Sequence, residues 1–211
     1  MDHAGASFEY GECYVNPADV ALLYEHGDVD KRYGFVMGGG KPEGAFVPKK
    51  EDVVPPCAVK TLPVQDGDVF DLGGVQIEAI AVPGHTVGTM VYLDRARRVL
   101  YSGDACNANT LLGLPCSTTV ETYAKSLDHL ATYLKGIDKF YGGHGLQAVP
   151  AYIVDEALIL CEEILSDDDD RFETEFLGRK FLYARKFDGM FHREDGGIAN
   201  IAYVMEKVYN K

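Results

Sequence analysis

The chain has 211 residues, 46% hydrophobic and 25% charged, a composition that supports one packed domain and excludes global disorder. Its formal net charge is −13. Because nucleic-acid binding depends on basic side chains that neutralise phosphates, no nucleic-acid partner is expected. No apolar run approaches the roughly 18 residues of a membrane span, so no membrane partner is expected either.

The N-terminal residues lack the basic and apolar regions of a secretory signal. The five cysteines are odd in number, and no pair has Cys-x-x-Cys spacing. These features predict a reduced, cytoplasmic protein without disulfide bonds.

In the N-terminal quarter, residues 12–15 are β-prone and predict a short strand. Asn16 and Pro17 then supply a cap and a first helical turn, so a helix is expected through about Glu25. Residues 27–56 are rich in Gly, Pro and Lys and predict a flexible lid or insertion. The glycine run within this segment lacks the Lys-Ser/Thr ending of a phosphate-binding loop.

The middle of the chain is β-rich, and glycine turns separate short apolar segments. Strands are predicted at 69–71, 75–82, 89–93, 99–102 and 140–141. Helical spacing of apolar residues predicts helices at 120–134 and 151–165, and a last strand is expected within 198–208, ending at Glu206. Hairpins with helices added between and after them predict an α/β fold with a mixed sheet.

Three short segments, Val82–Gly88, Tyr101–Ala105 and Tyr141–Gly145, each place a chemically useful residue beside glycine just after a predicted strand. The residues are His85, Asp104 and His144. Imidazole nitrogen and carboxylate oxygen are ligands that zinc and similar divalent ions accept. Taken singly, each residue is also typical of an ordinary turn.

Taken in order, Pro-Gly-His-Thr-x-Gly, Ser-Gly-Asp-Ala and Gly-His-Gly resemble the metallo-β-lactamase superfamily. The N-terminal Asp2-His3-Ala4-Gly5 is similar to the second half of that family's His-x-His-x-Asp-His motif. The resemblance implies an αββα sandwich, here a single domain over 1–211. It also implies a metal-dependent hydrolase that attacks an ester, thioester, lactone, lactam or small phosphoester with a metal-bound hydroxide.

The resemblance assigns a role to each matching residue. Asp2, His3 and His144 would bind the second of two metal ions, His85 would bind the first, and Asp104 would bridge them. Asp2 would also be catalytic, by orienting the nucleophile or accepting a proton. Zinc is the expected metal, with iron or manganese as alternatives.

The chain departs from the family pattern where it begins, because the His-x-His pair would precede Asp2. We therefore expect the first N-terminal strands to be absent, the metal site to be partly or wholly empty, and a homo-oligomer to cover the exposed face. The alternative is an inactive truncated fragment, or a non-catalytic binding protein with an incomplete metal site.

Three other histidines and one cysteine are further candidates. His26 ends a helix and His129 lies on an exposed helix face, where both have ordinary structural explanations. His192 lies in a late loop that could border the active-site mouth, so it is the candidate for binding a small-molecule substrate. Cys106 lies two residues after Asp104 and could contact it, but a buried structural thiol is the favoured interpretation. The sequence does not choose among the substrates.

Overall fold

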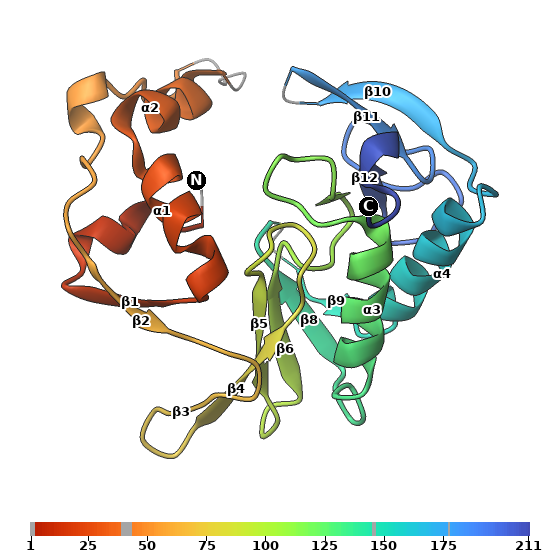
Figure 1. Cartoon of the computed structure of the whole chain (residues 1–211), viewed down its shortest axis with the longest axis horizontal. Coiled ribbons are helices and arrows are strands. Elements are labelled where there is room, and N and C mark those ends of the chain that lie inside the picture. Colours follow the sequence, from red (N-terminus) through yellow and green to blue (C-terminus); the bar gives the residue numbers. More distant parts are fainter. Residues whose placement is uncertain (1–2, 39–43, 145–146, 177) are drawn as a thin grey trace. The chain divides into compact units, whose positions relative to one another are not determined.

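The computed structural model describes residues 3–38, 44–144, 147–176 and 178–211. The chain divides into two compact units, residues 1–64 and 65–211 (Figure 1). Each unit has its own cluster of buried apolar side chains. The two units are therefore described separately.

The first unit pairs two short strands with several helical turns. Its elements are η1 (Gly5–Glu9), β1 (Glu12–Val15), η2 (Pro17–Asp19), α1 (Val20–Gly27), α2 (Val29–Gly38), η3 (Lys50–Asp52) and β2 (Lys60–Pro63). β1 and β2 are parallel. The predicted strand and the Asn16 cap are confirmed, because the Asn16 Oδ1 accepts the Ala18 N–H at 3.0 Å.

The predicted lid at 27–56 contains the helix α2, which the sequence analysis did not assign. Asp28 begins this helix, since its Oδ1 accepts the Lys31 N–H at 3.0 Å and so satisfies one of the first helical donors. The Arg32 guanidinium donates to the Val54 carbonyl at 2.6 Å, which ties the helix to the returning chain. The role of this segment as a lid stays a prediction.

The second unit is built on a six-stranded mixed sheet in the order β3-β4-β5-β6-β8-β9. Its strands are β3 (Val69–Asp71), β4 (Gln76–Ala81), β5 (Met90–Asp94), β6 (Val99–Gly103), β8 (Lys139–Gly142) and β9 (Val149–Pro150). The first four form an antiparallel meander, and β8 returns parallel to β6. The predicted strands are confirmed to within a residue or two, apart from the unforeseen β9.

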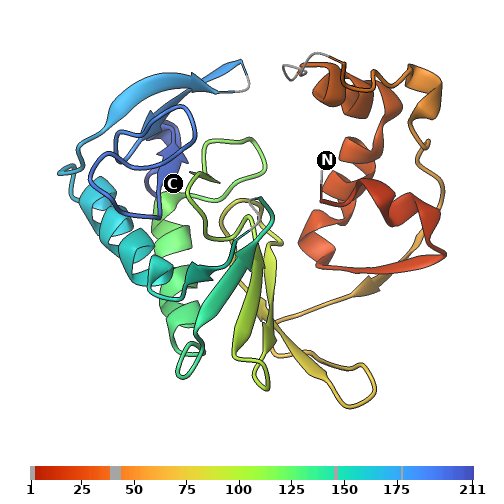
Figure 2. The ribbon, with the colours of Figure 1, turned by 180° about the vertical axis from the view of Figure 1, so that it is seen from behind.

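Two helices, α3 (Val120–Ala131) and α4 (Ile153–Leu165), lie together on one face of this sheet (Figure 1, Figure 2). Their apolar stripes join the alternate strand residues in one core, which includes Ile80, Leu100, Leu127 and Leu160. The prediction extended the first helix to residue 134, which was wrong. The chain tightens there into i→i−3 hydrogen bonds, such as the one from Leu134 N to Ala131 O at 3.2 Å.

A second, four-stranded sheet has the order β10-β11-β12-β7. Its strands are β7 (Thr110–Leu111), β10 (Phe172–Phe176), β11 (Arg179–Tyr183) and β12 (Ile201–Tyr203). The hairpin β10–β11 was not predicted, and the last predicted strand is shorter than expected. It stops at Tyr203 because the chain then turns into the 3-10 helix η4 (Met205–Lys207), where the Lys207 N–H bonds to Val204 O at 2.9 Å.

Within the acidic run Asp167–Asp170, Asp169 differs from its exposed neighbours. The Asp169 side chain is fully buried, accepts the Tyr203 hydroxyl at 2.7 Å and lies 2.8 Å from the Arg171 guanidinium. A buried carboxylate needs such partners to offset its desolvation.

The α/β class is confirmed by the mixed sheet with its covering helices. Within the described parts of the chain, none of the helices has the length and apolarity that a bilayer crossing requires.

Candidate metal centre

The three predicted ligands of the second unit follow three strands that end at the same edge of the sheet. His85 lies in the turn after β4, Asp104 follows β6, and His144 follows β8. Because β4 and β6 both run antiparallel to β5, and β8 runs parallel to β6, the carboxyl ends of all three strands meet there. The topology thus gathers residues that lie far apart in the sequence.

Asp104 stands between the two histidines, and each of its oxygens faces one imidazole. Its Oδ2 lies 3.8 Å from His85 Nε2, and its Oδ1 lies 3.5 Å from His144 Nε2. The side chains of Asp104 and His85 are mostly buried, at 16% and 21% exposed, whereas His144 is 62% exposed. The centre therefore has a sheltered side and an open side.

A hydrogen bond fixes the tautomer of His85. Its Nδ1 lies 3.1 Å from the Leu111 carbonyl oxygen. A carbonyl only accepts, so Nδ1 carries the proton, and in the neutral ring Nε2 offers its lone pair toward Asp104. Metal-binding histidines commonly use their second nitrogen in this way.

The loop that supplies the Leu111 carbonyl is itself anchored. The Ser117 hydroxyl lies 2.8 Å from His85 O and 3.1 Å from Leu111 O, so it joins the loop to the histidine turn. The Lys207 ammonium donates to three carbonyls of the same loop, including Leu114 O at 2.7 Å. Burial lowers the pKa of Lys207.

Tyr123 on α3 joins the His85 turn to the Asp104 turn. Its buried hydroxyl donates to the Ala105 carbonyl at 2.7 Å. Its ring lies so close to Gly84 that a Cβ there would be 2.5 Å from Tyr123 Cδ2. Burial holds the pKa of the Tyr123 phenol well above its usual value, so it stays a neutral donor.

Glycine shapes the Asp104 turn as well. Gly103 has a φ of +51°, and its carbonyl accepts the Gly143 N–H at 2.9 Å, which joins this turn to the one that carries His144. The Asn107 amide donates to Asp104 Oδ1 at 3.2 Å and orients the carboxylate.

The donor set fits a divalent metal centre. Two donor atoms bound tetrahedrally at about 2.0–2.2 Å to one ion lie about 3.4 Å apart. The two nitrogen–oxygen separations at Asp104, 3.5 and 3.8 Å, are close to that value. A carboxylate that turns one oxygen toward each histidine also suits two neighbouring ions.

The other two predicted ligands belong to the first unit of the chain. Asp2 is outside the described residues, so its metal-binding and catalytic roles stay predictions. His3 belongs to the first unit, just before η1, and its assignment as a ligand also stays a prediction.

The other histidines have structural partners. His26 lies in the last turn of α1, where burial lowers its pKa. His129 Nε2 lies 3.1 Å from both carboxylate oxygens of Asp66, on the surface. His192 pairs through Nδ1 with Asp188 Oδ2 at 3.2 Å. Cys106 is buried, which raises the pKa of its thiol to about 12, as a structural cysteine requires.

Sequence reasoning missed the residues that hold the centre in place, namely Ser117, Tyr123 and Lys207. Ser117 and Tyr123 each contact a turn of the centre from a distant part of the chain, and Lys207 holds the loop that carries Ser117. No local spacing marks any of them. The one usable signal was Gly84, because a glycine before a ligand often permits a close approach.

Ser117→Ala is expected to weaken metal binding about 10- to 100-fold, the usual effect of removing a group that orients a ligand. The reason is the loss of the hydroxyl that joins His85 O to Leu111 O. Competition with a chromophoric chelator measures the affinity. Ser166→Ala, which removes an exposed serine hydroxyl at the end of α4, is the control. An unchanged affinity in Ser117→Ala would contradict the assignment.

The chain is similar in sequence to known proteins. The model of the metallo-beta-lactamase superfamily matches residues 2–171. An acyl-coenzyme A thioesterase MBLAC2 from Gallus gallus is 29% identical over 151 residues, covering 68% of this chain and 53% of that protein. A hydroxyacylglutathione hydrolase from Acidiphilium cryptum is 32% identical over 128 residues, covering 56% of this chain and 45% of that protein.

A solved structure shares the fold. A metallo-beta-lactamase family protein from Thermus thermophilus superposes with a TM-score of 0.52 at 21% identity, covering 80% of this chain and 61% of that one. The chain spans about half the length of the two curated relatives named above. The family model covers most of the chain, and the predicted resemblance is confirmed: the chain belongs to the metallo-beta-lactamase superfamily.

Proposed function

We propose that this protein is a metal-dependent hydrolase of a small-molecule acyl thioester. The observation that carries the proposal is the arrangement at Asp104, where each carboxylate oxygen faces the Nε2 of a different histidine. Divalent ions bound at this centre would be held by His85, Asp104 and His144. Asp2 and His3 are proposed as further ligands, and zinc as the metal.

The chain's own residues prepare this chemistry. The Leu111 carbonyl holds the Nδ1 proton of His85, so that its Nε2 is directed to the metal side. The Asn107 amide keeps the Asp104 carboxylate oriented. Bound here, divalent ions supply polarisation of the substrate carbonyl and a nucleophilic water near neutral pH.

In the reaction, water adds to the carbonyl carbon and the C–S bond breaks. The acid and the free thiol are the products, and the thiol takes up a proton that the water gives up. Asp2 is proposed to carry that proton. The open side of the centre, at the exposed His144, leaves room for the substrate to approach.

The thioester class is favoured by the relatives. Both of those named above act on an acyl group carried by a thiol, coenzyme A in one and glutathione in the other. Esters, lactones, lactams and small phosphoesters are the other substrates that this fold would admit.

Metal reconstitution tests the function. The full chain, stripped of metal by a chelator, is titrated with zinc, iron or manganese, and bound metal and hydrolysis of acyl-coenzyme A and hydroxyacylglutathione are measured together. We expect hydrolysis to rise with bound metal, and a His129→Ala variant to behave as the parent chain does. Metal binding without hydrolysis of either thioester would overturn the proposal.

A further inference from the structure

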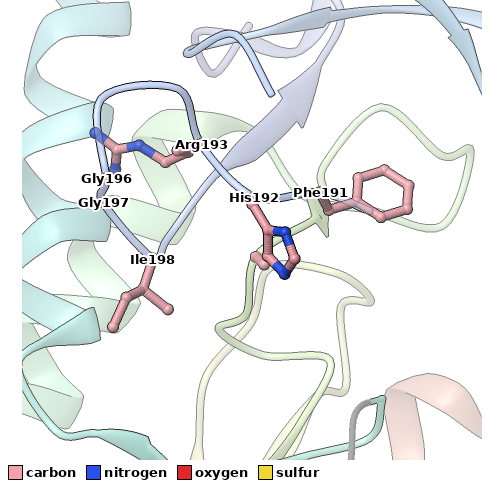
Figure 3. Close-up of a pocket in the computed structure, with 7 residues that line it drawn as sticks. Phe191, His192, Arg193, Gly196, Gly197 and Ile198 are labelled. Atoms are coloured by element: carbon pink, nitrogen blue, oxygen red, sulfur yellow. The ribbon is translucent and has the colours of Figure 1, made fainter. Parts of the chain in front are cut away.

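A cavity of about 230 Å³ lies in the second unit beside the loop of residues 187–198 (Figure 3). Ala108, Phe191, His192, Arg193 and Ile198 line it, together with two adjacent glycines. In Figure 3, His192 and Ile198 project from the two arms of the loop, while the Arg193 side chain lies within it beside Gly196 and Gly197.

The polar side chains of this lining are engaged with other groups. The Arg193 side chain is only 9% exposed, and its guanidinium donates to Asp195 Oδ1 and to Ala199 O, both at 2.8 Å. The imidazole of His192 is held through Nδ1 by Asp188. The cavity therefore presents mainly apolar surface, with His192 as a wall.

The loop is fixed before any ligand arrives. Asp188 Oδ1 accepts the N–H groups of Met190 and His192 at 2.8 and 3.0 Å. On the opposite arm, Glu156 accepts the N–H groups of Ile198 and Ala199 at 2.7 and 2.9 Å. A preformed apolar cavity binds without the cost of ordering its walls.

The cavity borders the metal centre through one short segment. Ala108 follows Asn107, whose side-chain amide touches the Asp104 carboxylate. Standard covalent dimensions then place the Ala108 Cα within about 11 Å of that carboxylate. The Asn200 N–H bonds to Asn107 O at 3.3 Å, which joins the Ile198 side of the cavity to the same segment.

We propose that this cavity binds the acyl chain of the substrate, an apolar chain of medium length. This rests on the proposed function, since it assigns the part of the thioester that extends away from the metal centre. An apolar cavity of about 150 Å³ holds benzene, so about 230 Å³ accommodates on the order of six to eight carbons. His192 determines specificity as a wall of the cavity.

Binding of neutral n-alkanols to the metal-free chain tests the cavity without any catalysis. NMR titration with butanol, hexanol, octanol and decanol is expected to show affinity rising about fourfold per methylene. The rise should stop at six to eight carbons, and the signals of Ala108 and Ile198 should shift. Constant affinity across the series, or shifts elsewhere, would overturn the proposal.

Two variants with matched controls locate the binding. Ala108→Leu fills the cavity and should stop the rise at about two to four carbons fewer, whereas Ala96→Leu, in the exposed β5–β6 turn, should leave it unchanged. His192→Ala should weaken hexanol binding, whereas His129→Ala, also an imidazole paired with an aspartate, should not. Equal effects of variant and control would count against the cavity.

Hydrolysis of acyl-coenzyme A of increasing chain length separates this proposal from the proposed function. If kcat/KM rises to six to eight carbons and Ala108→Leu shortens that range, both stand. Alkanol binding without hydrolysis would support the cavity as an apolar binding site and would refute the proposed hydrolase activity. Hydrolysis that is insensitive to both chain length and Ala108→Leu would retain the hydrolase and refute the cavity as its acyl site.

Discussion

Asp104→Asn is expected to lower kcat/KM of the metal-loaded protein at least about a thousandfold, the effect of losing about 4 kcal/mol of transition-state stabilisation. The amide is neutral and offers one acceptor oxygen where the carboxylate offers two. It would therefore offer only one oxygen ligand, whereas Asp104 turns one oxygen toward His85 and the other toward His144. Bound metal should fall with activity, because the same carboxylate is proposed to hold both ions.

Metal content and steady-state kinetics of the variant measure this effect. Asp138→Asn, which breaks an exposed ion pair with Arg98 at the start of β8, is the matched control and should change neither. Thermal unfolding should show that Asp104→Asn remains folded. Full metal content and activity in the folded variant would refute the bridging role of Asp104.

Gly84→Ala is expected to destabilise the second unit by about 2–3 kcal/mol, the usual cost of forcing extra atoms into a packed core. The new methyl group would lie 2.5 Å from a ring carbon of Tyr123, which is fully buried and held by its hydroxyl at Ala105. Relief requires the turn before His85 to move, so metal affinity should fall as well. The midpoint of urea unfolding and chelator competition measure the two effects.

Two further variants test the cause. Gly189→Ala, where a Cβ meets no atom within 4 Å, should change stability by less than about 0.5 kcal/mol. In a Tyr123→Leu background the ring is gone, so adding Gly84→Ala should cost at least about 1 kcal/mol less than it does in the parent chain. Fully additive effects would show that the Tyr123 ring is not what excludes a side chain at position 84.

Much of the second unit could be predicted from the sequence, because the deciding interactions are local. Strands β3 to β6 alternate with glycine turns, and the apolar spacing of α3 and α4 marks the faces they bury. The hairpin β10–β11 was missed although Phe172–Phe176 alternates between half-buried and exposed residues, so a strand signal was present in the sequence. Helix α2 was missed because its segment is rich in glycine, which favours a loop, so Asp28 was not recognised as a helix cap.

By itself, the sequence determined the family and marked His85, Asp104 and His144 as the candidate ligands, through the glycines beside each residue and the order of the three motifs. Only the tertiary structure decided how they are held. The strand order brings their three turns to one sheet edge. Ser117 and Tyr123 contact two of those turns from distant positions, and Lys207 holds the loop that carries Ser117. A ligand needs a particular side chain at its own position, and sequence records this directly. A residue that holds a ligand in position needs only to place a hydrogen-bond donor correctly, and the packing of the whole unit decides which residue does so.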